Sequence, residues 1–112
     1  MRSQLIKNAL LVNEGRTVAA DVRIKGDRID SIASSLSATA LDQVIDATGC
    51  YLMPGMIDDQ VHYSRSLCGW TPVADQQFSA RIVSTWVNGQ QVFNGYHILE
   101  PTRAAMPLLF NR

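Results

Sequence analysis

The sequence predicts an all-β fold, a single small β-sandwich domain, from three observations. Runs rich in β-branched residues recur along the chain, and no stretch of eleven or more residues carries the apolar stripe of an amphipathic helix. Two dipeptides suited to tight hairpin turns, Gly26-Asp27 and Asn88-Gly89, stand between such runs. With 112 residues and 46% hydrophobic content, the chain is long enough to bury one core and too short for two.

The first half of the domain begins with two expected strands. Leu5–Val12 is almost continuously apolar and is followed by the turn-forming residues 13–16. Asp21–Lys25 then alternates apolar and polar residues, as a half-buried strand does. These two segments are therefore expected to be the first strands of the sheet.

A tight turn at Gly26-Asp27 is expected to lead into the next strand, with glycine supplying a positive φ. Pairing through this turn places Ile24 opposite Ile29, so we expect the core face to continue across the hairpin. Ser31–Ala40 is rich in Ser and Ala and is expected to be a surface loop or a single helical turn.

Two shorter strands are expected next, at Val44–Ala47 and Tyr51–Met53, separated by a turn at Thr48-Gly49. Pro54-Gly55 should end the second of them, because proline removes a backbone donor from the ladder. Residues 64–78 have the composition of a loop.

The second hairpin signal is the stronger one. Ala80–Val87 is rich in β-branched and aromatic residues, Asn88-Gly89 is the favoured type I′ pair, and Gln90–Phe93 returns. Apolar side chains are expected on both faces of the outgoing strand: Ile82 and Trp86 on one, Val83 and Val87 on the other. Such a strand is typical of a sheet that is covered on two sides.

Charge and cysteine content exclude several classes of function. Ten basic residues balance ten acidic ones without any run of one sign, so neither nucleic acid nor a membrane is expected as a partner. The N-terminus has no secretory pattern, and the longest apolar run is far too short to span a bilayer. We expect a reducing cytoplasm in which Cys50 and Cys68 are free thiols, with a disulfide between them as the alternative.

Several motifs, in this order along the chain, resemble the dihydroorotases and related cyclic amidohydrolases. They are Val44–Gly49, Leu52–Tyr63, Cys68-Gly69-Trp70-Thr71-Pro72, Trp86-Val87-Asn88-Gly89 and the ending Leu108–Arg112. In that family the two chain ends fold together into a β-sandwich beside a (β/α)₈ barrel. A barrel needs ~250 residues, and only 49 residues follow Tyr63.

The resemblance therefore implies a composite domain that lacks the barrel. Residues 1–112 are expected to form this single domain, with an N-terminal segment 4–63, a junction loop 64–78 and a C-terminal segment 79–112.

The resemblance also implies that the metal site is absent. Family members bind zinc through a His-X-His pair on the first barrel strand and through ligands from later strands. Here Gln60 stands in the first position and only His62 matches. The arginine that contacts the substrate carboxylate in the family falls at Ser64, and Arg65 is one place out of register. We expect no catalytic, cofactor-binding or metal-binding residues, and no cofactor.

The remaining chemistry-bearing residues have ordinary structural interpretations. Asp58-Asp59 would point to opposite sides of a strand, which suits a solvated turn or a cap better than acid–base partnership. His62 and His97 are expected at the surface or in loops. Four aromatic residues are expected in the core or at its edge: Trp70, Trp86, Tyr96 and Phe110.

We expect a non-catalytic β domain with no small-molecule substrate. The alternative is an interaction or oligomerisation module that binds itself or a full-length amidohydrolase through the surface that faces the barrel in the family. In a further alternative residues 64–77 cover that surface and leave a monomer, and in another the chain is an enzyme with a small, unrelated site.

Overall fold

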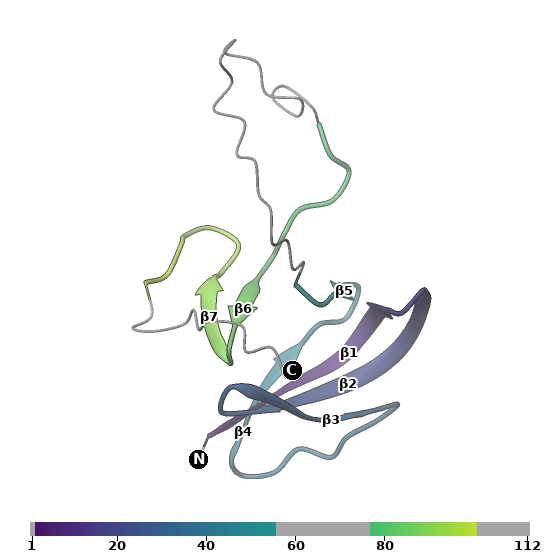
Figure 1. The fold of residues 1–112 in the computed structure, drawn as a ribbon, viewed down its shortest axis with the longest axis vertical. Helices are drawn as coiled ribbons and strands as arrows, with labels where there is room; N and C mark the ends of the chain where they lie inside the picture. The colour runs from purple at the N-terminus through teal and green to yellow at the C-terminus, as the bar shows by residue number, and fades with distance from the viewer. Residues whose placement is uncertain (1, 56–76, 101–112) are drawn as a thin grey trace, which may run out of the picture.

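The computed structural model describes residues 2–55 and 77–100, and every regular element among them is a strand. Five strands form one sheet in the order β3-β2-β1-β4, with β5 also paired to β1, and β6 and β7 form a separate two-stranded sheet (Figure 1). The strands are β1 (Ser3–Asn13), β2 (Arg16–Lys25), β3 (Arg28–Ala33), β4 (Asp42–Asp46), β5 (Tyr51–Leu52), β6 (Thr85–Val87) and β7 (Gln90–Phe93).

The prediction of an all-β fold is confirmed for the described residues, and neither sheet closes into a barrel. Within the same residues there is no helix with the length and apolarity needed to cross a membrane.

Strand β1 organises the larger sheet. One of its edges pairs antiparallel with β2 along almost its whole length, and the other pairs parallel first with β4 and then with β5. The link between β4 and β5 stays attached to this edge, because the Ala47 amide donates to the Lys7 carbonyl (2.8 Å) and the Leu10 amide donates to the Cys50 carbonyl (3.0 Å). The two predicted short strands around Thr48-Gly49 are therefore confirmed.

The predicted turn at Gly26-Asp27 is confirmed with its register. Lys25 pairs with Arg28, and Ile24 pairs with Ile29. Gly26 has a φ of 59°, as the first central residue of a type II′ turn requires.

The turn at Asn88-Gly89 is also as predicted. Both residues have positive φ, 48° and 76°, which is the signature of the type I′ turn. Val87 and Gln90 pair directly across it.

Two details of the predicted elements are wrong. Residues 31–33 belong to β3 rather than to a loop. The strand expected over Ala80–Val87 begins only at Thr85, so Ile82 and Val83 precede β6 and are largely exposed. Strand β6 is short because its partner β7 is short. The last residue of β7, Phe93, pairs with Thr85, and the Phe93 carbonyl also accepts a hydrogen bond from the Ser84 hydroxyl (3.2 Å).

The buried core lies in the middle of β1 and β2. Leu5 is fully buried, and the other core residues are Ile6, Ala9, Ala20 and Val22. Ile29 is 65% exposed, so the prediction that the core continues across the β2–β3 hairpin is wrong at this position. The reason is the topology, because β3 is the edge strand of the sheet.

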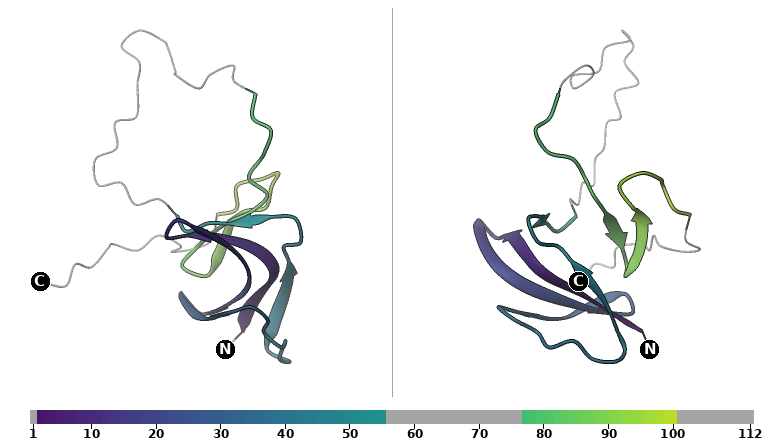
Figure 2. Two further views of the ribbon diagram at one scale, coloured as in Figure 1. Left: turned by 90° about the vertical axis from the view of Figure 1, so that its right-hand side faces the viewer. Right: turned by 180° about the vertical axis from the view of Figure 1, so that it is seen from behind.

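The β6–β7 hairpin stands at the end of the large sheet where β2 turns into β3, and its tip points at that turn (Figures 1 and 2). The hairpin therefore meets the large sheet at this turn, where Gly89 lies against Gly26 and accepts a hydrogen bond from Gln4.

Candidate functional site

Two irregularities in the strands gather the apolar side chains on one face of the large sheet. In β1, Lys7 and Asn8 together occupy the place opposite Asp21, so that Ile6 pairs with Val22 and Ala9 with Ala20. This is a β-bulge, in which two residues oppose one. Ile6 and Ala9 are three positions apart and would alternate between faces in a regular strand, but the bulge returns them to the same face.

The second irregularity acts in the same way on β3. Ile29 pairs with Ile24 and Ile32 pairs with Val22, with one extra residue, Asp30, on the β3 side. Directly opposed residues share a face, and Val22 and Ile24 are two positions apart. All four side chains therefore lie on the same face of the sheet.

This face and the β6–β7 hairpin enclose a hollow of about 270 Å³. The sheet contributes aliphatic side chains and the hairpin contributes Trp86, Asn88 and Gly89; Asp27 and Arg28 provide the charges among the described lining residues. Such a lining can hold apolar groups.

The backbone of the hairpin tip touches the backbone of the β2–β3 turn. A Cβ built on Gly89 would overlap the carbonyl oxygen of Gly26 and lie 2.9 Å from its carbonyl carbon. Since Gly89 also has a φ of 76°, both its conformation and its surroundings require glycine.

Gln4, on β1, stabilises this contact with a hydrogen bond. Its Nε2 donates a hydrogen bond of 2.9 Å to the carbonyl oxygen of Gly89. Its Oε1 is buried and has no hydrogen-bond partner among the described residues. The Gln4 side chain lies on the hollow's face, because it pairs with Ile24.

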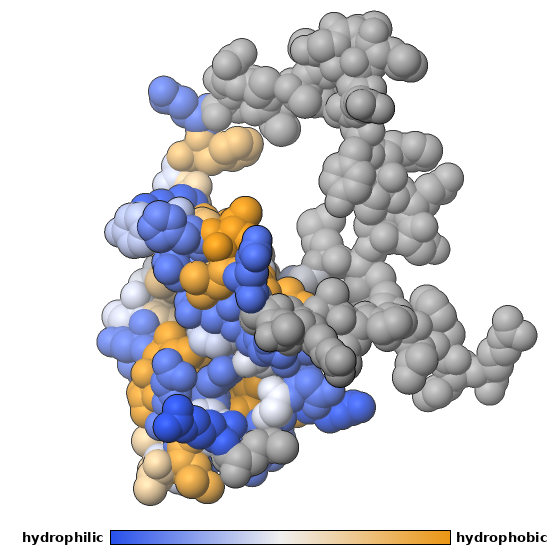
Figure 3. All heavy atoms as spheres, turned by 90° about the vertical axis from the view of Figure 1, so that its left-hand side faces the viewer, coloured by the Kyte–Doolittle hydropathy of each residue, from blue (hydrophilic) through white to orange (hydrophobic). Residues whose placement is uncertain are grey.

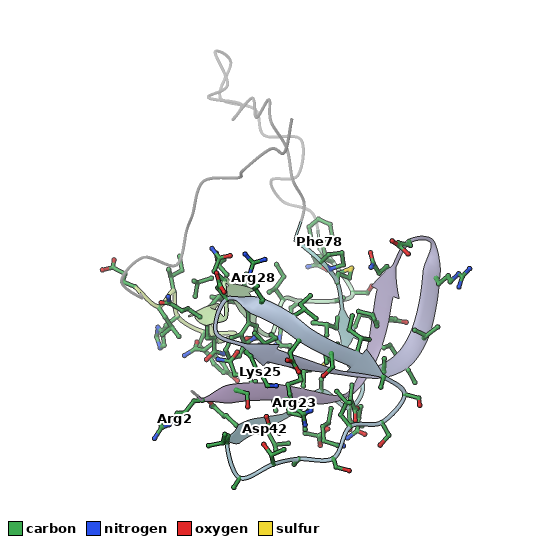
Figure 4. The ribbon with its side chains drawn as sticks, turned by 60° about the horizontal axis from the view of Figure 1, so that its bottom comes forward. Arg2, Arg23, Lys25, Arg28, Asp42 and Phe78 are labelled. Carbon is green, nitrogen blue, oxygen red and sulfur yellow. The ribbon has the colours of Figure 1, made fainter. Side chains whose placement is uncertain are left out.

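The opposite face of the sheet carries a buried polar network centred on Asp42. Arg23 donates to both carboxylate oxygens, from Nε at 3.3 Å and from Nη2 at 3.1 Å, and Figure 4 shows the two side chains pointing at one another. The Ser3 hydroxyl also donates to Asp42, as do the amide (2.8 Å) and hydroxyl (3.0 Å) of Thr39. These donors, Ser3 first, hold the pKa of Asp42 well below its usual range.

The carboxylate of Asp21 is the hydrogen-bond partner of a backbone amide in the β1 bulge. It accepts from the Asn8 amide (2.9 Å), from the Leu36 amide (2.8 Å) and from Lys7 Nζ (3.0 Å). These hydrogen bonds, with the Asn8 amide the strongest influence, lower the pKa of Asp21 to about 2. Lys7 also donates to the Leu36 carbonyl (2.7 Å), so the same group ties the loop after β3 to the sheet.

Asp46 plays the corresponding role after β4. Its Oδ1 accepts from the Thr48 hydroxyl (2.6 Å), the Thr48 amide (3.0 Å) and Asn8 Nδ2 (3.1 Å). The Thr48 hydroxyl, followed by Asn8, lowers the pKa of Asp46. The Val-Ile-Asp-Ala-Thr-Gly motif of residues 44–49 thus stabilises the link between β4 and β5 and its attachment to the bulge.

Comparison with known proteins shows that about half of the chain is similar in sequence to cyclic amidohydrolases. It is 44% identical to the dihydroorotase of Bacillus licheniformis over 62 residues. The matched segment makes up 54% of this chain and 14% of that enzyme. It is 43% identical to the allantoinase of Enterococcus faecalis over 63 residues. Here the matched segment makes up 55% of this chain and 13% of that enzyme. These partial similarities support a dihydroorotase-like cyclic amidohydrolase family, of which only a fragment is matched.

The similarity to solved structures is also partial. A D-hydantoinase (dihydropyrimidinase) from Thermus sp. is 41% identical, with a TM-score of 0.46, over 53% of this chain and 13% of that one. No family model matches the chain. The chain therefore spans about one seventh of the length of the amidohydrolases that it resembles.

Many of the residues singled out in the sequence, including Gln60 and His62 at the positions that match the amidohydrolase metal ligands, lie outside the described residues. These are Asp58, Asp59, Gln60, His62, Ser64 and Arg65, together with Cys68, Trp70, Phe110 and the ending Leu108–Arg112. Nearly all of the expected junction 64–78 also lies there. Among residues 2–55 and 77–100, no group of three or more His, Cys, Asp and Glu side chains is placed to hold a metal ion.

The predicted residues that the structure does describe are scattered. Trp86 is half-buried in the wall of the hollow, as expected for the core edge. Tyr96 is 75% exposed, so the prediction that it lies in the core or at its edge is wrong. The guanidinium carbon of Arg81 lies over its ring, 5.6 Å from the centroid. His97 is exposed, and its amide donates to Asn94 Oδ1 (2.8 Å). Cys50 is half-buried and free.

Sequence reasoning missed Gln4, Asn8 and Asp21, which the structure places at the key contacts. The signal available in β1 was the apolar spacing, because Ile6 and Ala9 are three positions apart in a segment that is otherwise predicted to be a strand. Such a step of three within a strand indicates a bulge.

Proposed function

We propose that this chain is a barrel-less β domain that does not hydrolyse cyclic amides on its own. The observation that carries the proposal is the extent of the similarity: the matched segments make up only 13–14% of the related dihydroorotases and allantoinase. A hydrolytic metal site needs about three protein ligands and an open position for water.

The described carboxylates support the same conclusion. Asp21, Asp42 and Asp46 each accept several hydrogen bonds from neighbouring backbone and side-chain groups. Each is therefore already used in holding the sheet together, and recruiting one of them as a ligand or a base would break those contacts.

The test combines zinc analysis with hydrolysis assays on dihydroorotate, allantoin, a dihydropyrimidine and a hydantoin, the substrate types that the relatives' names indicate. We expect no stoichiometric zinc and the same background rate for the chain and for its His62→Ala variant. Zinc near one equivalent, lost together with activity in His62→Ala, would contradict the proposal.

A second candidate function is that of an interaction module. The observation that favours it is the exposure of apolar side chains on the hollow's face, where Ile29, Ile32 and Val18 are 65%, 50% and 48% exposed. Figure 3 shows hydrophobic surface open on the side that carries the hairpin. Exposed apolar patches of a few hundred Å² often mark a binding surface.

Sedimentation equilibrium from micromolar to near-millimolar concentration tests this second candidate. Association that rises with concentration supports it. A 12.4 kDa monomer throughout, together with no binding of a hydrophobic dye, would contradict it.

A further inference from the structure

We propose that two copies of this chain associate through the free edge of β3, which pairs antiparallel with β3 of the second copy and joins the two large sheets into one. The proposal rests on the interaction module put forward above and names its partner and its contact surface. It does not depend on whether the chain hydrolyses a substrate.

Strand β3 has one unpaired edge. Among the described residues it pairs with β2 alone and stands at the end of the strand order of the large sheet (Figure 1). The connection that follows it is held over the polar face of the sheet, because Lys7 donates to the Leu36 carbonyl (2.7 Å) and Arg23 to the Ser37 carbonyl (2.6 Å). An uncovered edge of this kind is a template for a further strand.

The backbone groups of two isoleucines point out of this edge. A two-residue turn is closed by a hydrogen-bonded pair, which here is Lys25 and Arg28. The next pair, Ile24 and Ile29, is then of the non-hydrogen-bonded kind, so the N–H and C=O of Ile29 point away from β2. Ile32 has the same orientation, because its partner on β2 lies two positions from Ile24.

A second β3 that runs antiparallel complements these positions. In the register that pairs all six residues of both strands, Ile29 faces the partner's Ile32, and Ile32 faces the partner's Ile29. The two side chains are 65% and 50% exposed and lie on one face of the sheet, so the two copies bring four of them together.

The polar residues of β3 are compatible with the same register. Arg28 then faces the partner's Ala33, and Asp30 faces the partner's Ser31, so no two like charges are opposed. The Asp30 carboxylate is also paired within its own chain, with Lys25 Nζ at 2.9 Å. The strand is therefore complementary to a second copy of itself in its side chains as well as in its backbone.

Strand β4, at the other end of the strand order, does not allow such self-pairing. The antiparallel register that pairs all five of its residues places Asp42 opposite the partner's Asp46, and Asp46 opposite the partner's Asp42. Like charges directly opposite one another are destabilising. Each copy thus has one self-complementary edge on its large sheet, and pairing through it gives a closed two-fold dimer rather than an open chain.

Disulfide trapping tests the contact and its register. The partners of a hydrogen-bonded antiparallel pair have Cα atoms ~5.5 Å apart, within the range that a disulfide bridges. Full-length Ile29→Cys and Ile32→Cys chains, each also carrying Cys50→Ser and Cys68→Ser, are mixed in a glutathione redox buffer. We expect the mixed disulfide between positions 29 and 32 to form in several-fold excess over a control mixture of Ile29→Cys with Val44→Cys. Val44 is 50% exposed, like Ile32, and also lies on an edge strand.

Sedimentation equilibrium without cross-linking gives the second readout, from micromolar to near-millimolar concentration. The contact is one short strand on each copy, so the wild type should form a weak dimer that appears at the upper end of this range. Ile32→Lys places a charge on the edge, and the two-fold symmetry repeats it at both isoleucine contacts. We expect its dimer to be at least ~10-fold weaker. Val44→Lys, the matched control, should dimerise like the wild type. Circular dichroism confirms that each variant is folded.

The outcomes separate the proposal from the function beneath it. Preferential 29–32 trapping together with selective weakening by Ile32→Lys supports pairing through β3. Association of the wild type without trapping above the control, or with equal effects of Ile32→Lys and Val44→Lys, overturns it and leaves an interaction module that uses another surface. A ladder of larger species overturns the closed dimer. Monomers in every wild-type sample, with no trapping above the control, overturn both the proposal and the interaction module.

Discussion

Gln4 and Gly89 lie 85 positions apart in the chain and are joined by a 2.9 Å hydrogen bond from the Gln4 side chain to the Gly89 carbonyl. Gln4 belongs to the first strand, and Gly89 forms the turn of the last hairpin. The bond therefore links the N-terminal and C-terminal segments, which are the two parts of the predicted composite domain.

Replacing Gly89 by alanine should destabilise the protein more than replacing Gly49. Both glycines have a φ of 76°, so the backbone strain of the substitution is the same. Only at position 89 would the added Cβ overlap another backbone, that of Gly26. We expect an excess of ~1–3 kcal/mol for Gly89→Ala, in the range of overpacked sites, measured by urea unfolding. Equal losses for the two variants would show that the hairpin does not rest on the β2–β3 turn.

Removing the side chain at the centre of the sheet should have the largest effect. Leu5→Ala deletes a fully buried side chain, which costs about 2–5 kcal/mol in such positions. Leu10→Ala is the control on the same strand, because Leu10 is already 37% exposed. Denaturant unfolding should show a clearly smaller loss for Leu10→Ala, and the reverse order would contradict the placement of the core.

Breaking the Asp42 network should also destabilise the fold. Arg23→Gln removes the two guanidinium hydrogen bonds to Asp42, and the buried carboxylate is then left without its countercharge. Arg28→Gln is the matched control, because the Arg28 side chain is 87% exposed and its ion pair with Asp27 is long, 4.0 Å between Nε and Oδ1. We expect Arg23→Gln to lower the melting temperature markedly. The control should change the free energy of unfolding by no more than ~0.5 kcal/mol, and its melting temperature should therefore stay close to that of the wild type. Similar melting temperatures for both variants would argue against the network.

Stability should fall in acid. The hydrogen bonds from the Asn8 amide, the Leu36 amide and Lys7 lower the pKa of Asp21 to about 2 from its ordinary value of 3.8, so the folded state binds this proton less tightly than the unfolded state. The resulting stabilisation is present above the unfolded pKa and is lost as the pH falls from about 4 towards about 2. The depressed pKa values of Asp42 and Asp46 act in the same direction.

Thermal unfolding at a series of pH values between about 4 and about 2 measures this loss of stability. In Asp21→Asn the melting temperature should depend less steeply on pH than in the wild type. An Asp21→Asn profile with the same slope as the wild type would show that Asp21 is not among the groups responsible.

The sequence predicts local features of this fold well. The turns at Gly26-Asp27 and Asn88-Gly89 depend on the φ preferences of two residues, and the pairing of Ile24 with Ile29 follows directly from the first turn. The β-only class follows equally from short apolar runs without a helical stripe.

Features that depend on distant partners could not be predicted in the same way. The parallel pairing of β4 and β5 with β1, and the role of Asp21 in satisfying the Asn8 amide, are set by tertiary contacts. Ile29 was expected in the core because alternation gives the face of a residue, whereas its exposure depends on whether the strand lies at an edge.

For the candidate site, the sequence identified Trp86 and the Asn88-Gly89 turn but not Gln4. A glutamine in an apolar strand carries no local signal of its partner. Its function here becomes visible only when the Gly89 carbonyl is placed beside it.

The central claim is that residues 2–55 and 77–100 pack together as one β domain. Nuclear Overhauser effects between the side-chain amide protons of Gln4 and the α protons of Gly89, recorded in dilute solution, test it most directly. The account predicts clear cross-peaks there, alongside those between the paired strands β1 and β2. Cross-peaks within the large sheet but none between Gln4 and Gly89 would contradict it.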